Sequence, residues 1–337
     1  MHRQPKPTPS FAELVQVYFV EHLMQHRALS PQTIAAYRDA FTLFLGFAEA
    51  RLRRSPERIT LADITPDLIM AFLDHLEGER HNSVRSRNAR LAALRSFLKF
   101  AAHRDVSSLQ VIERALGVPA KRFERPMLSY LSRQQMLAVI GTPDGTWIGQ
   151  RDHVLLLLLY NTGARVSEIT GVKAGDVVLD DGSACVHLHG KGRKQRGVPL
   201  WRSTVRAIRA WLRRNPQLDA DSPLLPNRGG QPMSRWNVIE RLDRAVQAAA
   251  QTYPDLAKRQ ISPHTIRHST AMHLLQAGVD ISVIALWLGH ESPATTHQYV
   301  EADLAMKERA LARLHEPEAK LRRYRAPDSL INFLRTL

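Results

Sequence analysis

Apolar residues recur at spacings of three and four along most of the first third of the chain. In the first such segment, one helical face carries Phe11, Leu14, Val15 and Tyr18. This spacing predicts a helix with one buried side. Two further helices are predicted to begin at a capping hydroxyl followed by proline, Ser30-Pro31 and Thr65-Pro66. The apolar stripe of Leu91, Leu94 and Leu98 predicts a fourth, from about Ser83 to Ala102. We therefore predict one small all-helical domain over residues 11–118, preceded by a disordered leader at residues 1–10.

The pattern changes after residue 118. Residues 119–132 carry charges and prolines without periodicity, which predicts a linker. Beyond the linker, short apolar runs bounded by glycine-containing turns predict strands at 177–179, 184–188 and 197–200. Helical patterns surround these strands, from about 132, over 151–161, from about 165, and over 203–214, 234–252, 265–277 and 280–288. The predicted fold class is mainly α, with a second, α+β domain at residues 133–305 that holds a small three-stranded antiparallel sheet.

Composition narrows the class of protein. A length of 337 residues suits two domains that each bury a core. The single cysteine, Cys185, cannot form an intramolecular disulfide, which favours a reducing cytoplasm. The longest apolar run, Val154 to Tyr160, falls far short of the ~20 residues of a membrane span, and the N-terminus lacks the apolar core of a signal peptide.

The charge balance points to a partner. The chain has 47 Lys and Arg against 32 Asp and Glu, a formal net charge of +15. Phosphates attract such a surface by Coulomb forces and counterion release, so nucleic acid is the predicted partner, with a merely solvated basic surface as the alternative. The helix from about Ser83 carries the cations that we predict to lie along a phosphate backbone: Arg85, Arg87, Arg90, Arg95 and Lys99.

Several polar residues stand at spacings that could support chemistry. Arg165 and Glu168 lie three apart after a buried helix, so they share one helical face, as a phosphate clamp or as an ordinary ion pair. His264 and Arg267 have the same spacing. His290 follows a glycine that ends a helix. Tyr299 lies nine residues later and, taken alone, is more typical of a core.

Two other constellations predict different chemistry. His187 and His189 alternate on a strand and so face one side, as metal ligands could, but no carboxylate or cysteine cluster with metal-ligand spacing lies near. The segment Gly190-Lys191-Gly192-Arg193-Lys194 lacks the spacing and the hydroxyl residue of a nucleotide-binding loop. We predict neither a metal nor a nucleotide cofactor.

Taken together, the motifs resemble those of the tyrosine recombinases, or phage integrase family. The resemblance rests on five strings in order: Thr-Gly-Ala-Arg-Val-Ser-Glu from Thr162, Gly-Lys-Gly-Arg-Lys-Gln-Arg from Gly190, His-Thr-Ile-Arg-His from His264, Leu-Trp-Leu-Gly-His from Leu286, and Thr-Thr-x-x-Tyr ending at Tyr299. It covers roughly residues 11–305, and Ser30 to Tyr37 is similar to part of the family's N-terminal DNA clamp. Ala164 departs from the larger apolar residue that is common there, without consequence for catalysis.

The resemblance implies a role for each candidate residue. Arg165 and Arg267 would hold the non-bridging oxygens of a scissile phosphate, and His290 would donate a third hydrogen bond. Tyr299 would attack phosphorus and form a 3′-phosphotyrosine. Lys191 would protonate the leaving 5′ oxygen, with Lys194 as the alternative acid. Three residues would assist: His264 as acid or base, Glu168 by orienting its neighbours, and Arg193 by contacting DNA, as Lys194 would.

The family likeness also implies partners. It predicts a SAM-like DNA-clamp domain at residues 11–118 and a homo-tetramer on two DNA duplexes with short inverted-repeat sites, with other recombinases or accessory proteins as further partners. Residues 306–337 would dock on a neighbouring subunit or fold back on their own domain. The leader before Phe11 is too short for an arm-binding domain.

The sequence is compatible with four functions. The basic chain and long C-terminal end favour an integrase or transposase of a mobile element. A resolvase of chromosome or plasmid dimers is the alternative within the family. A DNA-binding protein without catalysis and a metal-dependent nuclease using His187 and His189 are the alternatives from other classes.

Overall fold

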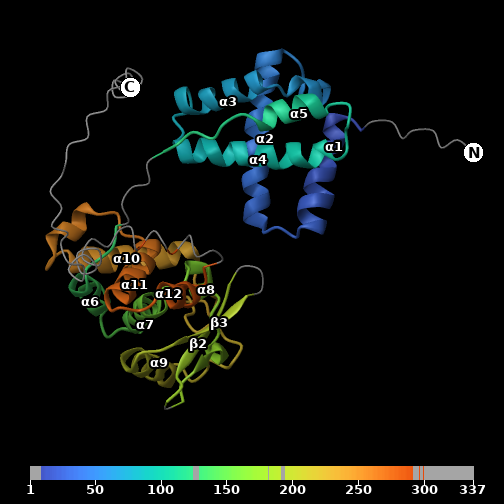
Figure 1. Cartoon of the computed structure of the whole chain (residues 1–337). Helices are drawn as coiled ribbons and strands as arrows, with labels where there is room; N and C mark the ends of the chain where they lie inside the picture. Colours follow the sequence, from blue (N-terminus) through green and yellow to red (C-terminus); the bar gives the residue numbers. More distant parts are fainter. Residues whose placement is uncertain are drawn as a thin grey trace, which may run out of the picture. The chain divides into compact units, whose positions relative to one another are not determined.

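The chain forms two compact units, Met1–Arg125 and Pro126–Leu337 (Figure 1). The computed structural model describes residues 9–123, 129–180, 182–190 and 194–290, together with Thr296 and Tyr299. Most of the predicted leader and all of residues 306–337 lie outside the described residues. The division between the units falls inside the predicted linker, at residues 119–132.

The first unit is all-helical in its described part, which confirms the prediction. Its elements are α1 (Phe11–Val17), the π-helix η1 (Tyr18–His26), α2 (Pro31–Leu52), the short 3-10 turns η2 (Pro56–Arg58) and η3 (Leu61–Asp63), α3 (Pro66–Gly78), α4 (Val84–Ala102) and α5 (Leu109–Leu116). The hydroxyls of Ser30, Thr65 and Ser83 accept backbone hydrogen bonds at the N-termini of α2, α3 and α4. Ser10, which we assigned to the leader, caps α1 in the same way.

The π-helix η1 was not predicted. Its i→i+5 bonding ends where the amide of Arg27 donates to the carbonyl oxygen of His22 at 2.9 Å. Apolar residues that recur every three and four positions mark a buried face in an α-helix and in a π-helix, so the sequence pattern does not distinguish the two kinds of helix.

The second unit places a small sheet among helices. Its elements are α6 (Arg133–Gly141), α7 (Trp147–Thr162), α8 (Val166–Thr170), η4 (Ala174–Asp176), β1 (Val177–Val178), β2 (Cys185–His189), β3 (Gln195–Pro199), α9 (Arg202–Arg214), α10 (Arg235–Ala249), η6 (Pro254–Lys258), α11 (Pro263–Gln276) and α12 (Ile281–Leu288). The strands form one antiparallel sheet in the order β1-β2-β3, with Val186 opposite Val198. The predicted three-stranded sheet is confirmed, although β3 begins earlier, at Gln195.

Helix α7 forms the centre of the second core. Its residues from Val154 to Thr162 are all buried, against α9 on one side and α11 on another. Leu131 is also fully buried, and its amide donates to the Ser269 hydroxyl of α11 at 2.9 Å. The end of the predicted linker therefore packs into this unit. Because α7 is held on several sides, its C-terminus is a fixed point for the residues that follow.

Among the described residues, none of the helices combines the length and apolar character needed to cross a bilayer.

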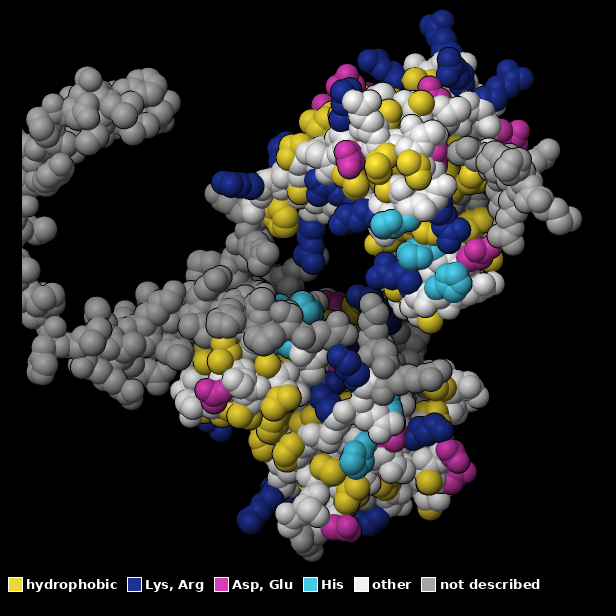
Figure 2. All heavy atoms as spheres, turned by 45° about the vertical axis from the view of Figure 1, so that its right-hand side comes forward, with side chains coloured by type: hydrophobic (Ala, Val, Ile, Leu, Met, Phe, Trp, Pro, Cys, Tyr) yellow, Lys and Arg dark blue, Asp and Glu magenta, His cyan; other side chains and the backbone are white. Residues whose placement is uncertain are grey.

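Helix α4 directs its cations in different directions. Arg85 and Lys99 are exposed, whereas Arg90 is half-buried and donates to the Ser86 carbonyl. Arg95 donates to the carbonyl oxygens of Leu116 and Val118, so it holds the end of α5. Figure 2 shows Lys and Arg side chains on the surfaces of both units. Not every cation that the sequence analysis placed along a phosphate backbone lies on that surface.

Arg87 is the clearest departure from the predicted DNA-contacting set. It is only 4% exposed, and its Nε lies 3.1 Å from Oε1 of Glu77, an ion pair without hydrogen-bond alignment. The ammonium of Lys121 reaches the other oxygen of Glu77. The predicted phosphate contact is therefore corrected for Arg87, because its guanidinium is buried against α3.

We expect Arg87→Met to lower the free energy of unfolding of the first unit by about 3 kcal/mol, since it leaves a half-buried carboxylate with one cation fewer. The exposed Arg85→Met should change it by less than about 0.5 kcal/mol. Urea unfolding of the two variants measures the difference. Equal effects would mean that the buried ion pair adds nothing to stability.

Candidate active site

Two helix ends create the framework of the site. Helix α7 ends at Gly163 and α12 ends at Gly289, both in the left-handed conformation, with φ of 58° and 64°. A Cβ on Gly163 would lie 2.5 Å from Cδ2 of Leu288, and one on Gly289 would lie 2.9 Å from a guanidinium nitrogen of Arg196. Glycine is therefore required at both positions by backbone conformation and by close approach.

Arg267, on α11, joins these two helix ends. Its two terminal nitrogens donate to the carbonyl oxygens of Gly163 at 2.6 Å and of Leu288 at 2.7 Å. Carbonyls at helix C-termini carry partial negative charge, which favours a cation. The guanidinium is 2% exposed, and burial followed by repulsion from Arg165 lowers its pKa to about 10. Arg267 is therefore still charged at neutral pH and fixed in place.

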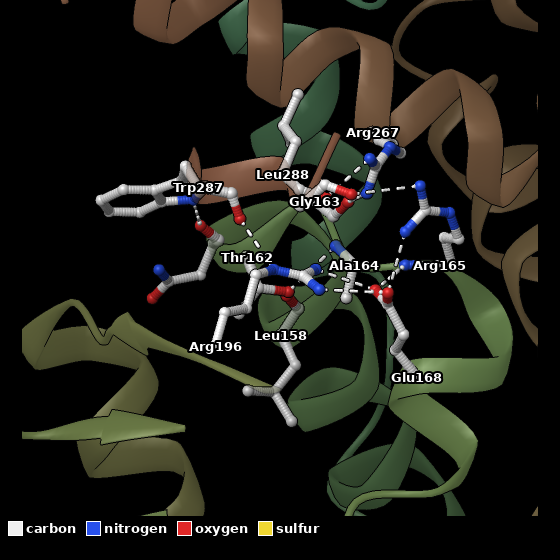
Figure 3. Close-up of polar contacts among 12 residues, drawn as sticks. Leu158, Thr162, Gly163, Ala164, Arg165, Glu168, Arg196, Arg267, Trp287 and Leu288 are labelled. Carbon is white, nitrogen blue, oxygen red and sulfur yellow. Dashed lines mark hydrogen bonds and ion pairs between the residues drawn. The ribbon is translucent and has the colours of Figure 1, made fainter. Parts of the chain in front are cut away.

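Glu168 holds two more arginines (Figure 3). Its carboxylate accepts from the Arg165 side chain at 2.9 Å and from the Arg165 amide at 2.8 Å. Arg196, from β3, makes a two-point contact with the same carboxylate at 3.1 and 2.8 Å, and its Nε donates to the Trp287 carbonyl at 2.9 Å. Burial alone would raise the pKa of Glu168, but the hydrogen bonds from Arg196 and Arg165 outweigh it and lower the pKa. The carboxylate is therefore ionised.

The cluster has more positive charge than negative. Three guanidinium groups come together from the N-terminus of α8, from β3 and from α11, and within the described part of the chain Glu168 is the carboxylate that pairs with two of them, Arg165 and Arg196. Arg165 keeps 45% of its side-chain surface exposed, whereas Arg196 keeps 14%. An anion entering from the Arg165 side would meet uncompensated positive charge on an exposed guanidinium group. Phosphate is an anion that guanidinium groups bind well, because their planar N–H groups match the spacing of its oxygens.

His290 lies beside the cluster. Its Nδ1 is 2.7 Å from the Thr296 hydroxyl, and its ring is stacked on that of Tyr299 with centroids 6.3 Å apart. Burial and the field of Arg267, Arg165 and Arg196 lower its pKa to about 4. It is therefore neutral at physiological pH.

Tyr299 brings a hydroxyl into the same place. Its side chain is 1% exposed, and its Oη lies 3.0 Å from Nδ1 of His268. The ring of His268 in turn contacts the ring of His264, with centroids 4.4 Å apart, and His264 itself is exposed. The structure thus brings together five of the predicted residues, namely Arg165, His264, Arg267, His290 and Tyr299, with Glu168 in support.

The predicted lysines are placed less fully. Lys191 and Arg193 lie outside the described residues. Lys194 is exposed, and its carbonyl accepts from the Gly190 amide at 2.7 Å to close the turn between β2 and β3. A Cβ on Gly190 would lie 3.3 Å from a carboxylate oxygen of Glu168, so the turn starts next to the arginine cluster.

Two residues of the site were missed from sequence. Arg196 was the last letter of the Gly-Lys-Gly-Arg-Lys-Gln-Arg string and His268 the last of His-Thr-Ile-Arg-His, but neither received a role. Alternation along β3 could not show that Arg196 would meet Glu168. The spacing of His268 from Tyr299 carries no signal, since the two lie on separate segments.

The histidines of β2 form no metal site in the part of the chain that the structure describes. His187 and His189 both face outward, as their alternation predicts. Nε2 of His189 lies 3.0 Å from Asp176, and Nε2 of His187 lies 3.8 Å from Sγ of Cys185. Within the described ranges no group of three or more His, Cys, Asp or Glu side chains could hold a metal ion.

Known sequence families match both units. The phage integrase family matches residues 129–306, and the N-terminal SAM-like domain of phage integrases matches residues 17–105. The chain belongs to the phage integrase family. These matches confirm the fold that the resemblance implied, a SAM-like N-terminal domain followed by a catalytic domain.

Similar proteins are recombinases. "Putative integrase/recombinase y4rC" of Sinorhizobium fredii is 45% identical over 97% of this chain and 98% of its own length. "Tyrosine recombinase XerC" of Pelobacter propionicus is 34% identical over 88% and 95%. The fold is similar to that of the XerH site-specific recombinase bound to palindromic difH substrate, with a TM-score of 0.70, 19% identity and coverage of 89% and 84%. It is also similar to the Tn1549 transposon integrase in complex with a circular intermediate DNA, with a TM-score of 0.66, 16% identity and coverage of 89% and 99%.

The shared carboxylate generates the first prediction for the recombinase site. We expect Glu168→Gln to slow covalent DNA cleavage by about 100-fold, because Arg165 and Arg196 lose the charge that aligns them. The matched control is Glu240→Gln, which removes a carboxylate that pairs with Arg244 on α10. Single-turnover cleavage at saturating DNA measures both, and equal rates would contradict a positioning role for Glu168.

His268 and His290 generate a prediction about how stability depends on pH. His268 and His290 have a pKa of about 4 in the folded recombinase, against 6.5 when unfolded. Between pH 6.5 and 4 the unfolded chain binds protons that the folded chain does not. The free energy of unfolding therefore falls as the pH is lowered from 6.5 to 4, by at most about 3 kcal/mol for each histidine. Urea unfolding across this window should show a smaller fall in the double variant His268→Asn/His290→Asn. The control is the exposed His187→Asn, which should keep the wild-type fall.

Proposed function

We propose that this protein is a site-specific DNA recombinase that cuts and rejoins DNA through a 3′-phosphotyrosine on Tyr299. The observation that carries the proposal is a cluster of three guanidinium groups beside a buried tyrosine hydroxyl: Glu168 holds Arg165 and Arg196, and two backbone carbonyls hold Arg267. Such a cluster stabilises the charge that develops on a phosphate under attack.

The arginines provide the binding of the scissile phosphate. Arg165 and Arg267 hold its two non-bridging oxygens, while Arg196 keeps Arg165 in place through Glu168. His290 contributes a third donor: when the Thr296 hydroxyl donates to Nδ1, the neutral ring carries its proton on Nε2 and can donate it to the phosphate. A neutral donor adds a hydrogen bond without adding repulsion to the cluster.

Bond exchange then balances without an external energy source. The Tyr299 oxygen forms a bond to phosphorus as the bond to the 5′ oxygen breaks. The phenol proton leaves to His264 or to solvent, and the 5′ oxygen takes a proton from Lys191, with Lys194 as the second candidate. A 5′-hydroxyl of another strand later attacks the phosphotyrosine and restores a phosphodiester.

The partners follow from the same chemistry. Relatives of this fold have been described bound to a palindromic difH substrate and to a circular intermediate DNA of a transposon. We propose double-stranded DNA with short inverted repeats as substrate, a homo-tetramer on two duplexes, and residues 306–337 as the segment that docks on a neighbouring subunit. We propose that the protein acts in the cytoplasm and belongs to a mobile element. The alternative role is the resolution of chromosome or plasmid dimers.

The exposed cations of the first unit support a role in holding the duplex. Arg85 and Lys99 lie on α4 with their charges open to solvent, so they are the members of the predicted set that can reach phosphates. When both units bind one duplex, the first unit contacts its backbone and Arg165 of the second unit binds the scissile phosphate.

The test is covalent trapping on a nicked suicide substrate taken from the flanks of the encoding element, in EDTA. We expect a protein–DNA adduct with the wild-type protein and with the control Tyr253→Phe, and none with Tyr299→Phe. Adducts with Tyr299→Phe would remove the nucleophile assignment. Tight binding to that DNA without any adduct would favour a DNA-binding protein that lacks catalysis, and cleavage that leaves no adduct and needs a divalent metal would favour the nuclease.

A further inference from the structure

His268 occupies a position that the proposed chemistry does not yet use. It follows Arg267 on α11, is 9% exposed, and has its Nδ1 at 3.0 Å from the Tyr299 hydroxyl oxygen. The two rings meet edge to face, with centroids 5.6 Å apart and an interplanar angle of 61°. A buried polar contact of this kind fixes the direction of both groups.

The surroundings of His268 determine which atom donates. Burial, followed by repulsion from His264 and Arg267, lowers the pKa of His268 to about 4. The ring is therefore neutral at physiological pH, with one nitrogen that accepts. A phenol is the stronger donor of the pair, so the arrangement in which the Tyr299 hydroxyl donates to Nδ1 satisfies both groups.

We propose that His268 is a positioning residue for the nucleophile, whose Nδ1 accepts the Tyr299 hydroxyl hydrogen and turns a lone pair of that oxygen toward the phosphate. This inference rests on the proposed function. Because His268 lies one residue from Arg267, the helix that places the phosphate-binding guanidinium also places the acceptor for the attacking group. Both reacting partners are thus aligned by α11.

Orientation, rather than proton uptake, is the role that the charges favour. Taking the phenol proton would place an imidazolium next to Arg267, in a site that already carries excess positive charge. As the bond to phosphorus forms, the phenol proton leaves this hydrogen bond for solvent or for His264, which is exposed and can release it, whereas His268 is enclosed and does not keep it. The acceptor at Nδ1 should therefore matter more than the basicity of the ring.

Two amide variants separate these roles. In His268→Asn the side-chain oxygen can take the place of Nδ1, and in His268→Gln it reaches instead toward the position of Nε2. We expect adduct formation on the nicked substrate, at saturating DNA, to stay within about 5-fold of wild type for Asn and to fall by about 10- to 100-fold for Gln and for His268→Leu. Thermal unfolding of each variant shows that the fold is kept.

The outcomes are distinct. Rescue by Asn but not by Gln supports positioning. Equal loss in Asn and Gln means that His268 takes the proton itself, and wild-type rates in both mean that the contact has no role; either overturns the inference and leaves the recombinase assignment intact. Absence of an adduct with the wild-type protein would instead count against the proposed function.

A second readout does not depend on DNA. The ¹³Cζ resonance of Tyr299, assigned by its loss in Tyr299→Phe, reports the hydrogen bond of the phenol. We expect it to move in His268→Gln and to stay near its wild-type position in His268→Asn. An unmoved resonance in both variants would show that the bond is absent in solution and would overturn the inference.

Discussion

A single buried carboxylate determines how the second unit presents its charge. Glu168 is 2% exposed at its side chain and accepts hydrogen bonds from Arg165 and Arg196, which come from different parts of the fold. Without it, two guanidinium groups would repel one another in a poorly solvated place. With it, they are held side by side, and the cluster keeps a positive excess. Binding strength for an anion is thus obtained from charge that folding leaves uncompensated.

Burial and the neighbouring positive charge set the protonation of the two histidines. Burial is the main reason that the pKa values of His290 and His268 are low, and the nearby arginines lower them further, so both rings are neutral and can act as a donor and an acceptor of single hydrogen bonds. Burial and repulsion also lower the pKa of Arg267, but it stays charged, and the carbonyls of Gly163 and Leu288 support that charge. The site therefore combines groups that must be charged with groups that must not be.

Much of this could be predicted from sequence, because local rules govern it. Hydroxyl caps marked the helix starts, glycine-containing turns marked the sheet, and the i,i+3 spacing of Arg165 and Glu168 anticipated their contact. The rest depends on tertiary packing. Arg196 contacts Glu168 because the fold brings β3 close to α8. Arg87 is buried because the carboxylate of Glu77, on α3, pairs with it. Periodicity states which residues share a face, and it does not state what that face meets.

The use of Leu288 and Gly289 to complete the arginine cluster has a consequence for biosynthesis. The Leu288 carbonyl that accepts from Arg267 at the end of α12 is made long after the first unit, which has its own core and can fold as soon as it leaves the ribosome. A nascent chain that stops short of residue 289 therefore has a complete first unit but not the residues that complete the arginine cluster of the second. The order of synthesis delays the assembly of the site until most of the chain has been made.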